Sequence, residues 1–501
     1  MPSGNNSFQA SSETRLGVSP MRSDHLRAWL PLIFGATAYL TLIGRIDSLL
    51  RDTDIYWHIA VGQWIIDHRA VPHVDPFSFT MRDAPWITSG WLSEVLYFAA
   101  FKLAGWPGAA FLAALSASVA FFLLTHLLLK RLPNTPVMIL VGGGLVMTAF
   151  HMLARPHVLI FPLMVVWANA LVQASEERRA PSFVYLPLIT LWANLHGSFT
   201  LGLALIAPFA LEAIWTADKS ARVAIALRWL GFGALALVAA CITPYGPESI
   251  LVTFRILDLG PILSTIGEWK PALDFGTLNP ITICFIAGMA YVLYSGLKLP
   301  PIRIAALLAV VSQTLAHVRY VDVCALVAPF FTAGPLAQHL GWPQLQHNRK
   351  IVPVSRTALV IAIAGLAIVT GVILGTGDHT PPRAPRVAVE KLRQLNAGRI
   401  LNDYSFGGYL ISQGSPTFID SRAELYGPVF LNRYLRTVSL DDLADFVKLL
   451  DEYKIDATLL FPSTPAIALL DRMPEWERTY ADDIAVVHVR RMRAGRADSL
   501  N

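Results

Sequence analysis

The sequence predicts an α-helical polytopic membrane protein with about eleven transmembrane helices, followed by a C-terminal soluble α/β domain. Two observations lead to this fold class. Hydrophobic residues make up 54% of the 501 residues and charged residues 15%, whereas an ordinary globular protein has about 25% charged residues. The apolar residues also gather in runs of about 20, the length that a helix needs to cross a hydrocarbon core of about 30 Å. Much of the chain is therefore expected to contact lipid or other protein residues and not water.

Eleven apolar segments are candidates for such spans, and the fifth is shorter than this length. The predicted spans are 28–48, 107–129, 135–151, 157–174, 181–194, 198–216, 222–242, 279–297, 302–318, 321–340 and 354–375. Residues 1–27 are polar, contain Arg15 and Arg22, and show no A-x-A cleavage site. We therefore expect a cytoplasmic N-terminal tail before an uncleaved first span.

Positively charged residues orient the spans, because cytoplasmic loops are enriched in Lys and Arg. With the N-terminus inside, every inside connection has at least two such residues. They are Lys130 and Arg131, Arg178 and Arg179, Lys219 and Arg222, Lys298 and Arg303, and Arg349, Lys350 and Arg356. This orientation places the long loops 49–106 and 243–278 and the C-terminal domain outside, on the periplasmic side of a bacterial inner membrane. A re-entrant fifth segment would move the C-terminal domain to the other side.

Charge and cysteine content exclude two classes of protein. The net charge of +5 is small for this length, and the chain has no block of Lys and Arg long enough to bind nucleic acid. The cysteines, Cys241, Cys284 and Cys324, lie in or beside apolar runs without metal-ligand spacing. We expect neither a disulfide framework nor a structural metal site, and interpret the cysteines as buried thiols.

The first outer loop contains an acidic pair, Asp52 and Asp54, where the first span meets water. An amphipathic helix is predicted from Ile55 to about Asp67, and a second amphipathic segment at 91–97 precedes the second span. One interpretation of the pair is a helix N-cap, which needs one Asp. The other is a functional carboxylate, catalytic or metal-binding, such as a base that deprotonates an acceptor while a lipid-linked donor lies in the bilayer.

The order of these features resembles that of the GT-C superfamily of membrane glycosyltransferases. Protein O-mannosyltransferases, lipid A aminoarabinose transferases and rhizobial galacturonosyltransferases share a first span, an acidic pair, two interfacial helices and a second span. Four motifs are similar to those of a bacterial subgroup of GT-C-like proteins. They are Asp-x-Asp before Tyr-Trp-His-Ile, Val-Pro-His-x-Asp-Pro-Phe-Ser, Trp-Ala-Asn-Leu-His-Gly at 192–197 and Asp-Tyr-x-x-Gly-Gly-Tyr-Leu at 403–410.

The resemblance implies a sugar transfer from a polyprenyl-phosphate donor to a lipid, glycan or protein acceptor. Asp52, with Tyr56 four residues later, matches the position of the general base. The chain departs from many relatives because Thr53 separates the two acids, so either Asp52 or Asp54 is a candidate for the catalytic residue. The resemblance does not identify one sugar or acceptor.

Further polar residues fall at the predicted outer face, where ionisable groups near membrane depth are candidates for functional sites. The candidate substrate-binding residues are Tyr56, His58, His73, Asp75, Glu94, Arg155, His157, Asn194, His196, Glu268 and Arg319. Arg155 and Arg319 suit a polyprenyl-phosphate leaving group, because a guanidinium holds a developing negative charge with paired hydrogen bonds. The alternative is that each anchors a helix end at the lipid headgroups.

His196 suits hydrogen bonding to substrate or helix packing equally well. The set of His58, His73, Asp75, His157 and His196 has no helical metal spacing. A divalent cation is therefore not favoured, and we assign no metal ligand and no cofactor.

The C-terminal domain is predicted at 386–501, after a turn-rich linker at 377–385. Strands are expected at Arg399–Asn402, Thr417–Asp420, Asp456–Phe461 and Ile484–Arg490, and an amphipathic helix at Leu440–Tyr453. The Gly-Gly pair at 407–408 is too short for a dinucleotide fingerprint. Asp403, Asp420, Arg422 and Glu424 form either a substrate-recognition patch or a salt-bridge cluster that docks the domain on the membrane part, and we favour the second.

The leading hypothesis is therefore a GT-C-like glycosyltransferase whose partners are a lipid-phosphate donor, its acceptor and membrane lipids. A transporter or flippase is the first alternative. It would show internal repeats and interrupted helices with charge at the midplane, and neither is visible in the sequence. A non-catalytic envelope-polysaccharide assembly protein with the same fold is the second alternative.

Overall fold

The computed structural model describes residues 20–149, 151–265, 267–342, 354–377 and 379–491. Three predicted features lie outside these residues. They are Arg15 of the N-terminal tail, Arg349 and Lys350 of the last inside loop, and the end of the C-terminal domain at 492–501.

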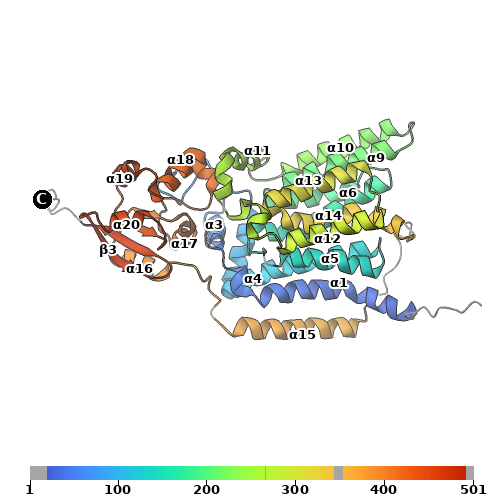
Figure 1. The fold of residues 1–501 in the computed structure, drawn as a ribbon, viewed down its shortest axis with the longest axis horizontal. Coiled ribbons are helices and arrows are strands. Elements are labelled where there is room, and N and C mark those ends of the chain that lie inside the picture. The colour runs from blue at the N-terminus through green and yellow to red at the C-terminus, as the bar shows by residue number, and fades with distance from the viewer. Residues whose placement is uncertain (1–19, 150, 266, 343–353, 378, 492–501) are drawn as a thin grey trace, which may run out of the picture.

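Helices fill the first three quarters of the described chain and form an elongated bundle (Figure 1). The first half of this part contains α1 (Pro20–Ile43), α2 (Ile46–Leu49), α3 (Asp54–His68), α4 (Trp91–Leu129), α5 (Asn134–Thr148), η1 (Pro156–Ile160), α6 (Phe161–Glu176), η2 (Phe183–Tyr185) and α7 (Leu186–Leu195). The second half contains α8 (Phe199–Ala204), α9 (Ile206–Thr216), α10 (Arg222–Ala240), α11 (Glu248–Arg255), η3 (Ile256–Thr265), η4 (Gly267–Trp269), η5 (Ala272–Phe275), α12 (Pro280–Ser295), α13 (Pro301–Ala316), η6 (Val318–Tyr320), α14 (Val321–His339) and α15 (Arg356–Gly375).

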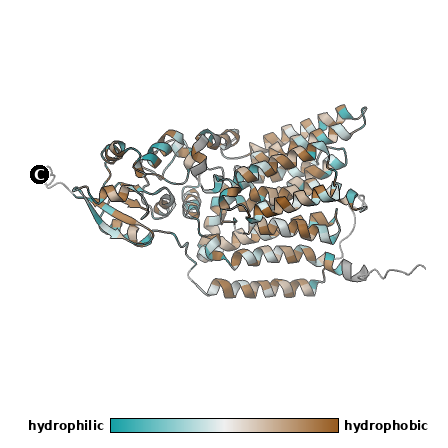
Figure 2. Ribbon diagram, viewed as in Figure 1, coloured by the Kyte–Doolittle hydropathy of each residue, from teal (hydrophilic) through white to brown (hydrophobic). Residues whose placement is uncertain are grey.

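Each predicted span coincides with an apolar helix, and hydrophobic residues dominate these helices in Figure 2. Within the described residues, seven helices are long and apolar enough to cross a membrane. The four shorter apolar helices, Asn134–Thr148, Phe183–Leu195, Pro280–Ser295 and Pro301–Ala316, lie at the third, fifth, eighth and ninth predicted spans. The chain is therefore a multi-pass membrane protein by composition and fold, and the count of eleven crossings stays a prediction.

Helix α4 combines the second amphipathic segment with the second predicted span. Its backbone leaves the helical region at Ala104 and Gly105, where Gly105 has φ +62°, a conformation that side chains with a Cβ rarely adopt. Pro107 follows and lacks the N–H that a continuous helix would need from it. The resulting kink separates the amphipathic half from the apolar half, which begins where the second span was predicted.

Helix α3 lies unusually close to α4, and a glycine makes this approach possible. A Cβ built on Gly62 would stand 2.1 Å from the carbonyl oxygen of Glu94 and 2.8 Å from Cβ of Phe98. No side chain fits in that space, so the contact fixes α3, with the acidic pair at its start, against the amphipathic half of α4.

The C-terminal domain is an α/β unit with a four-stranded sheet. The strands are β1 (Ile400–Asn402), β2 (Ala457–Leu460), β3 (Trp476–Ala481) and β4 (Val486–Arg490), in the order β1-β2-β4-β3. β1 and β2 are parallel, and the other two pairs are antiparallel. The helices are α16 (Arg386–Gln394), η7 (Tyr404–Phe406), α17 (Gly407–Ser412), α18 (Ala423–Val438), α19 (Leu443–Glu452) and α20 (Ala466–Leu470).

Three of the four strands predicted in this domain form, and the strand expected at Thr417–Asp420 does not. Thr417 instead makes an isolated parallel bridge with Ser78 of the first outer loop. The backbone N–H of Phe79 donates to the Thr417 carbonyl at 3.0 Å, and that of Thr417 donates to the Phe77 carbonyl at 3.3 Å. The apolar pattern at this segment is therefore explained by docking between domains and not by a place in the sheet.

The second outer loop also packs on the C-terminal domain. One buried cluster joins Leu259, Leu263 and Trp269 of that loop to Phe418 and Tyr426. Figure 1 shows the C-terminal domain with α3 and α11 at one end of the bundle. Both long loops and the C-terminal domain thus share one end of the molecule, as the positive charges predicted, and we call this the outer end.

A second charged cluster lies among the helix ends opposite. Arg303, predicted as a loop cation, is 3% exposed within α13 and donates to Glu212 at 2.8 Å and Glu176 at 3.0 Å. Ser175 donates to Glu212 at 2.9 Å, and Arg131 pairs with Glu176. Two cations and two anions balance, so this cluster satisfies its own charges and ties α6, α9 and α13 together.

Candidate active site

The candidate site is centred on Arg155 at the outer end. Its guanidinium pairs with Asp52 and Glu268, and with Asp54 at 2.8 Å. The three acids come from two outer loops that are more than 200 residues apart in the chain. The sequence predicted all four residues as site candidates, and the structure brings them into direct contact.

Local backbone contacts fix each member of the cluster. Asp52 accepts a hydrogen bond from the Asp54 N–H at 3.1 Å, so it closes a turn before α3 and still pairs with Arg155. Arg155 is extended before Pro156 and η1. The neighbouring Ala154 N–H donates to the Leu49 carbonyl at 2.9 Å, which ties this segment to the end of α2. The N-cap of α3 is Thr53, and no side chain caps this helix, so the N-cap interpretation of the acidic pair is wrong. Both acids instead face the arginine.

Arg319 extends the cluster through Glu268. Its Nη1 lies 3.3 Å from Oε1 of Glu268, and its guanidinium stacks 4.3 Å from the centroid of the Trp269 ring. The backbone holds this arrangement, because the Trp269 carbonyl hydrogen-bonds Nδ1 of His317 at 2.8 Å. Among the described residues, Nη1 of Arg319 finds no acceptor with hydrogen-bonding geometry. Arg319 is thus held by an ion pair with Glu268 and by the Trp269 ring, and its buried Nη1 lacks a well-aligned hydrogen bond.

The electrostatics separate the roles of the carboxylates. Burial, with the adjacent charge of Asp52, raises the pKa of Asp54 to about 7, although Arg155 opposes the rise. Burial also disfavours ionisation of Glu268, but Arg155 and Arg319 outweigh it and lower the Glu268 pKa to about 2. At neutral pH, Glu268 is an ionised counter-ion to the two arginines, whereas Asp54 is able to exchange a proton.

Histidines from two further segments border the cluster. His157 Nε2 lies 3.7 Å from Asp322 at the start of α14, and its ring centroid lies 6.1 Å from that of His196. His196 Nδ1 contacts the Ser198 hydroxyl at 2.8 Å. Burial, reinforced by Arg319, lowers the pKa of His196 to about 4. His196 is therefore neutral near pH 7 and is able both to donate and to accept a hydrogen bond.

His58 and Glu94 form a neighbouring pair between α3 and α4. The His58 Nδ1 and Glu94 Oε1 atoms are 3.4 Å apart, and the Thr88 hydroxyl donates to the same oxygen at 2.7 Å. Burial, with the charge of Arg155, lowers the pKa of His58 well below its ordinary value. This pair lies within electrostatic reach of Arg155 without an ion pair to it.

Tyr56 and His73, two other predicted residues, lie in packing contacts. The buried Tyr56 ring packs edge-on against Trp106 at 4.8 Å and Tyr409 at 5.1 Å between centroids. His73 is exposed and packs against Tyr245.

Asn194 and Asp75 are fully engaged elsewhere. Asn194 accepts a hydrogen bond from Trp91 at 2.8 Å and donates to the carbonyls of Thr190 and Ile242. Asp75 is buried and pairs with Arg422 of the C-terminal domain at 2.7 Å. The alternative favoured for Arg422, a salt-bridge cluster that docks the domain, describes this contact.

The sequence prediction missed two residues at the site. Asp322 is 2% exposed beside His157, and an acid one residue into the apolar run 321–340 was a usable signal. Ser421 of the C-terminal domain accepts a hydrogen bond from Trp57 of α3 at 3.0 Å and favours the ionised form of Asp54. No pattern in the sequence distinguishes it from other serines, because the contact depends on how the domain docks.

The oxygens of Asp52, Asp54 and Glu268 share the guanidinium of Arg155. In the part of the chain that the structure describes, no group of three or more His, Cys, Asp or Glu side chains is placed to hold a metal ion.

Comparison with known proteins identifies the fold. No protein-family model matches the chain, and no curated protein matches it in sequence. The oligosaccharyltransferase AglB of the archaeon Archaeoglobus fulgidus, in complex with an inhibitory peptide and a dolichol-phosphate, matches with a TM-score of 0.54 at 13% identity, over 86% of this chain and 69% of that chain.

Two further structures of the Archaeoglobus fulgidus oligosaccharyltransferase also match. The one tethered to an acceptor peptide has a TM-score of 0.54 at 12% identity over 86% of this chain, and the apo form has 0.52 at 12% over 87%. Each match covers 69% of the archaeal chain. AglB is a GT-C superfamily glycosyltransferase, and at this identity the likeness concerns the fold. The chain therefore has a GT-C-like fold, as its motifs predicted.

Proposed function

We propose that this protein is a GT-C-type glycosyltransferase of the bacterial inner membrane, which transfers a sugar from a polyprenyl-phosphate donor to a lipid, glycan or protein acceptor on the periplasmic face. The observation that supports it most is the convergence of Asp52, Asp54, Arg155, Glu268 and Arg319 at the outer end of an apolar helix bundle. The dolichol-phosphate bound to AglB, which has the same fold, agrees with a lipid-phosphate donor.

The acidic pair is suited to activate the acceptor. A carboxylate whose pKa lies near the working pH both accepts a proton and remains ionised often enough to do so, and Asp54 has a pKa of about 7. In the proposed reaction Asp54, coupled to Asp52, takes the proton of an acceptor hydroxyl or amine. The acceptor atom then bonds to the anomeric carbon of the donor while the bond between that carbon and the phosphate oxygen breaks.

The leaving phosphate takes the electron pair of the broken bond and gains negative charge. Arg319 is the better placed of the two arginines to stabilise this charge, because it pairs with a single carboxylate, Glu268, and stacks on the Trp269 ring. Arg155 is occupied by three carboxylates, so we assign it to holding the acidic pair and Glu268 in position.

The distribution of charge favours a transferase over a transporter. A transporter would place charged groups near the membrane midplane at interrupted helices. In the described residues the two main charged clusters, around Arg155 and Arg303, lie at helix ends. A non-catalytic assembly protein would share this architecture, and the test below distinguishes it.

The proposal is tested with Asp52→Asn and Asp54→Asn in a deletion strain. Lipid-linked sugars and envelope glycoconjugates are extracted and compared by mass spectrometry. We expect the deletion to accumulate one lipid-linked sugar and to lose one glycoconjugate, and at least one of the two variants to reproduce this phenotype at normal protein levels. Asp67→Asn, an exposed change on the same helix α3, is the matched control and should complement fully. If both site variants also complement fully, the assignment of a catalytic base is wrong.

A further inference from the structure

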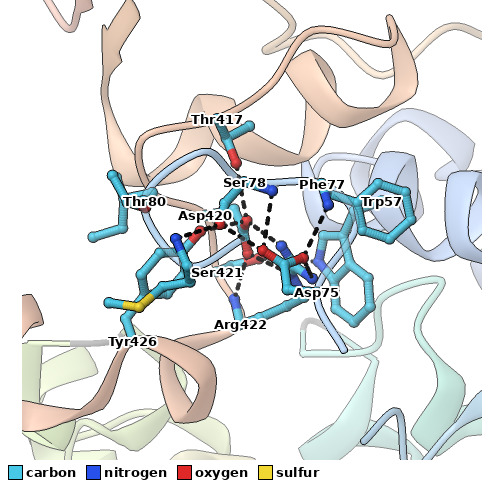
Figure 3. A network of polar contacts seen from close by, with 12 residues as sticks. Trp57, Asp75, Phe77, Ser78, Thr80, Thr417, Asp420, Ser421, Arg422 and Tyr426 are labelled. Carbon is cyan, nitrogen blue, oxygen red and sulfur yellow. Dashed lines mark hydrogen bonds and ion pairs between the residues drawn. The ribbon is translucent and has the colours of Figure 1, made fainter. Parts of the chain in front are cut away.

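A buried ion network joins the C-terminal domain to the first outer loop (Figure 3). The side chains of Arg422, Asp75 and Asp420 are 0% exposed. Arg422 donates to Asp75 at 2.7 Å and binds both oxygens of Asp420, at 2.8 Å through Nε and 2.7 Å through Nη2. Its guanidinium also lies 4.5 Å from the centroid of the Trp86 ring. Such bidentate geometry allows one orientation of the segment 420–422.

The two carboxylates of this network are satisfied by further donors. Asp75 accepts the N–H groups of Phe77 at 3.1 Å and Ser78 at 3.0 Å. Asp420 accepts the Tyr426 hydroxyl at 2.7 Å. A buried arginine between two fully hydrogen-bonded acids is costly to rearrange, because any opening leaves a buried charge without a partner. The network therefore fixes the C-terminal domain rigidly on the first outer loop, and we call it the Arg422 joint.

Ser421 lies in the chain between the two charged residues Asp420 and Arg422, and it contacts the first turn of α3. Trp57 Nε1 donates to its hydroxyl oxygen at 3.0 Å, and the Tyr404 hydroxyl donates to its carbonyl at 3.1 Å. Helix α3 begins at Asp54, and the Ser421 side chain favours the ionised form of that carboxyl. A serine hydroxyl is able to donate to an ionised carboxylate, which only accepts. One residue of the C-terminal domain thus lies beside a candidate base of the membrane part.

Close backbone packing keeps the two parts in register beside this contact. The Thr53 hydroxyl donates to the Ser405 carbonyl at 2.7 Å. A Cβ on Gly408 would stand 2.7 Å from the Thr53 carbonyl oxygen, so α17 sits directly on the start of α3. The residue between the two acids, Thr53, therefore contacts the C-terminal domain, while the acids themselves pair with Arg155.

We propose that Ser421 is a positioning residue of the catalytic site, which Arg422 and Asp75 hold in place so that Asp54 is oriented as a base only while the C-terminal domain is docked. This inference rests on the proposed function, because it assigns Ser421 to the same base. It gives the C-terminal domain a role in positioning the catalytic base. The hydrogen bond from Ser421 stabilises the ionised form of Asp54 and so opposes the rise of its pKa that burial causes.

The test measures the protonation of Asp54 without any sugar substrate. Dicyclohexylcarbodiimide modifies protonated carboxyl groups in apolar surroundings, and peptide mass spectrometry quantifies the adduct at Asp54 as a function of pH in the full-length protein in nanodiscs. We expect modification of the wild type to decrease as the pH rises through about 7. In Ser421→Ala the midpoint should move upward by roughly 1–2 pH units, the effect of losing one hydrogen bond to a charged group.

Two matched variants separate positioning from general damage. Ser421→Thr keeps the hydroxyl and should retain the wild-type midpoint, and Ser439→Ala, an exposed serine of the same domain, should do the same. Arg422→Lys keeps the charge but loses the bidentate contact, so it should shift the midpoint in the direction of Ser421→Ala. A midpoint in Ser421→Ala that equals that of the wild type overturns the inference.

The outcomes distinguish this inference from the proposed function. If Asp54→Asn abolishes sugar transfer but Ser421→Ala leaves the pH midpoint unchanged, the base is retained and the role of Ser421 is wrong. If Ser421→Ala shifts the midpoint while Asp52→Asn and Asp54→Asn both transfer sugar normally, the docking contact is retained and the catalytic role of the pair is wrong. Should Arg422→Lys fail to fold, Ser421→Ala alone decides.

Discussion

Arg155 is the residue on which the candidate site depends. Three carboxylates and two guanidiniums meet there, so the cluster has one excess negative charge when all members are ionised. The side chain of Arg155 is 19% exposed, and water compensates the surplus only in part. The carboxylates are stable as a group because a single guanidinium contacts all three.

Replacing this arginine should therefore make stability depend on pH. In Arg155→Gln, Asp52, Asp54 and Glu268 lose their common counter-ion, and the folded state favours their protonated forms. Acids whose pKa is raised by folding destabilise the folded state as pH rises, so the loss of stability should be larger at pH 8 than at pH 5. We expect a loss of roughly 3 kcal/mol at the higher pH, measured by thermal unfolding in nanodiscs.

Two further variants control this experiment. Glu268→Gln in the Arg155→Gln background removes one of the repelling acids and should recover part of the stability. Arg433→Gln breaks a partly exposed pair with Asp445 and should cost at most about 1 kcal/mol. A loss in Arg155→Gln that is the same at both pH values would contradict the charge-cluster interpretation.

Asp322 is the most informative residue that the sequence prediction missed. Both of its carboxylate oxygens are buried without a hydrogen bond among the described residues, and His157 Nε2 is its nearest ionic partner at 3.7 Å. A buried carboxylate without hydrogen bonds destabilises the folded state, so its presence here indicates a functional role. We predict that Asp322→Asn lowers sugar transfer by about 10- to 100-fold, because His157 loses its orienting charge, while the melting temperature does not fall. A parallel decrease in both quantities would indicate a structural role.

At the scale of elements, the relation of α3 to α4 decides where the acidic pair lies. Gly62 permits backbone contact between the two helices, and the pair stands at the first turn of α3. A shift of α3 would move Asp54 relative to Arg155, which is fixed from a different segment. The position of Asp54 relative to Arg155 therefore depends on the backbone contact between α3 and α4, although no residue of the candidate site makes that contact through its side chain.

Gly62→Ala tests this dependence. The new Cβ would overlap the Glu94 carbonyl, so the helices must separate, and we expect a loss of about 1–3 kcal/mol in unfolding free energy together with reduced sugar transfer. Gly288→Ala in α12 is the control, because nothing lies within 4 Å of its added Cβ and alanine favours a helix. Equal behaviour of the two variants in thermal unfolding would show that the α3 and α4 contact is not tight.

The sequence predicts these elements well where one local pattern suffices. Apolar length placed each helix of the bundle, and amphipathic periodicity placed α3 and the first half of α4. It failed at Thr417–Asp420, where an extended apolar segment pairs with Ser78 of a distant loop and not with the sheet. It also did not anticipate β3, whose alternating exposure is weak at its register shift near Arg478.

The residues of the candidate site were likewise predictable from the sequence only in part. Asp52, Arg155, Glu268 and Arg319 were predictable, because charges beside apolar runs are conspicuous and the Lys and Arg pattern assigned them to one face. Ser421 was not, since its contact with Asp54 follows from the docking of a separate domain. Asp75 stood among the predicted substrate ligands on its motif, and the structure places it in the ion network with Arg422.

At the scale of the whole molecule, both long loops and the C-terminal domain share one end of the bundle (Figure 1). The Arg303 cluster lies among the opposite helix ends. The prediction that both long loops share one face with the C-terminal domain thus has a geometric basis, and the compartment of that face stays a prediction from the charge of the short loops.

Cysteine labelling tests this orientation in intact cells. Cys241, Cys284 and Cys324 are first replaced, and single cysteines are introduced at the exposed positions Asp67, Ser439 and Lys219. With the outer membrane made permeable, a membrane-impermeant maleimide should label the first two and should reach the position of Lys219 only after the inner membrane is lysed. Labelling of the Ser439 position and the Lys219 position under the same condition would contradict the predicted topology.

Helix α15 has a consequence for how the C-terminal domain moves. None of its apolar window is buried, and it lies at the edge of the bundle beside α1, where Tyr39 and Thr370 share a hydrogen bond at 3.0 Å. From its end to α16 the chain has only residues 376–385, which span at most about 35 Å when fully extended. If the ion network around Arg422 opens, the C-terminal domain stays attached to the membrane part at a local concentration on the order of millimolar. Redocking is then an intramolecular event, and its rate does not depend on the concentration of the protein.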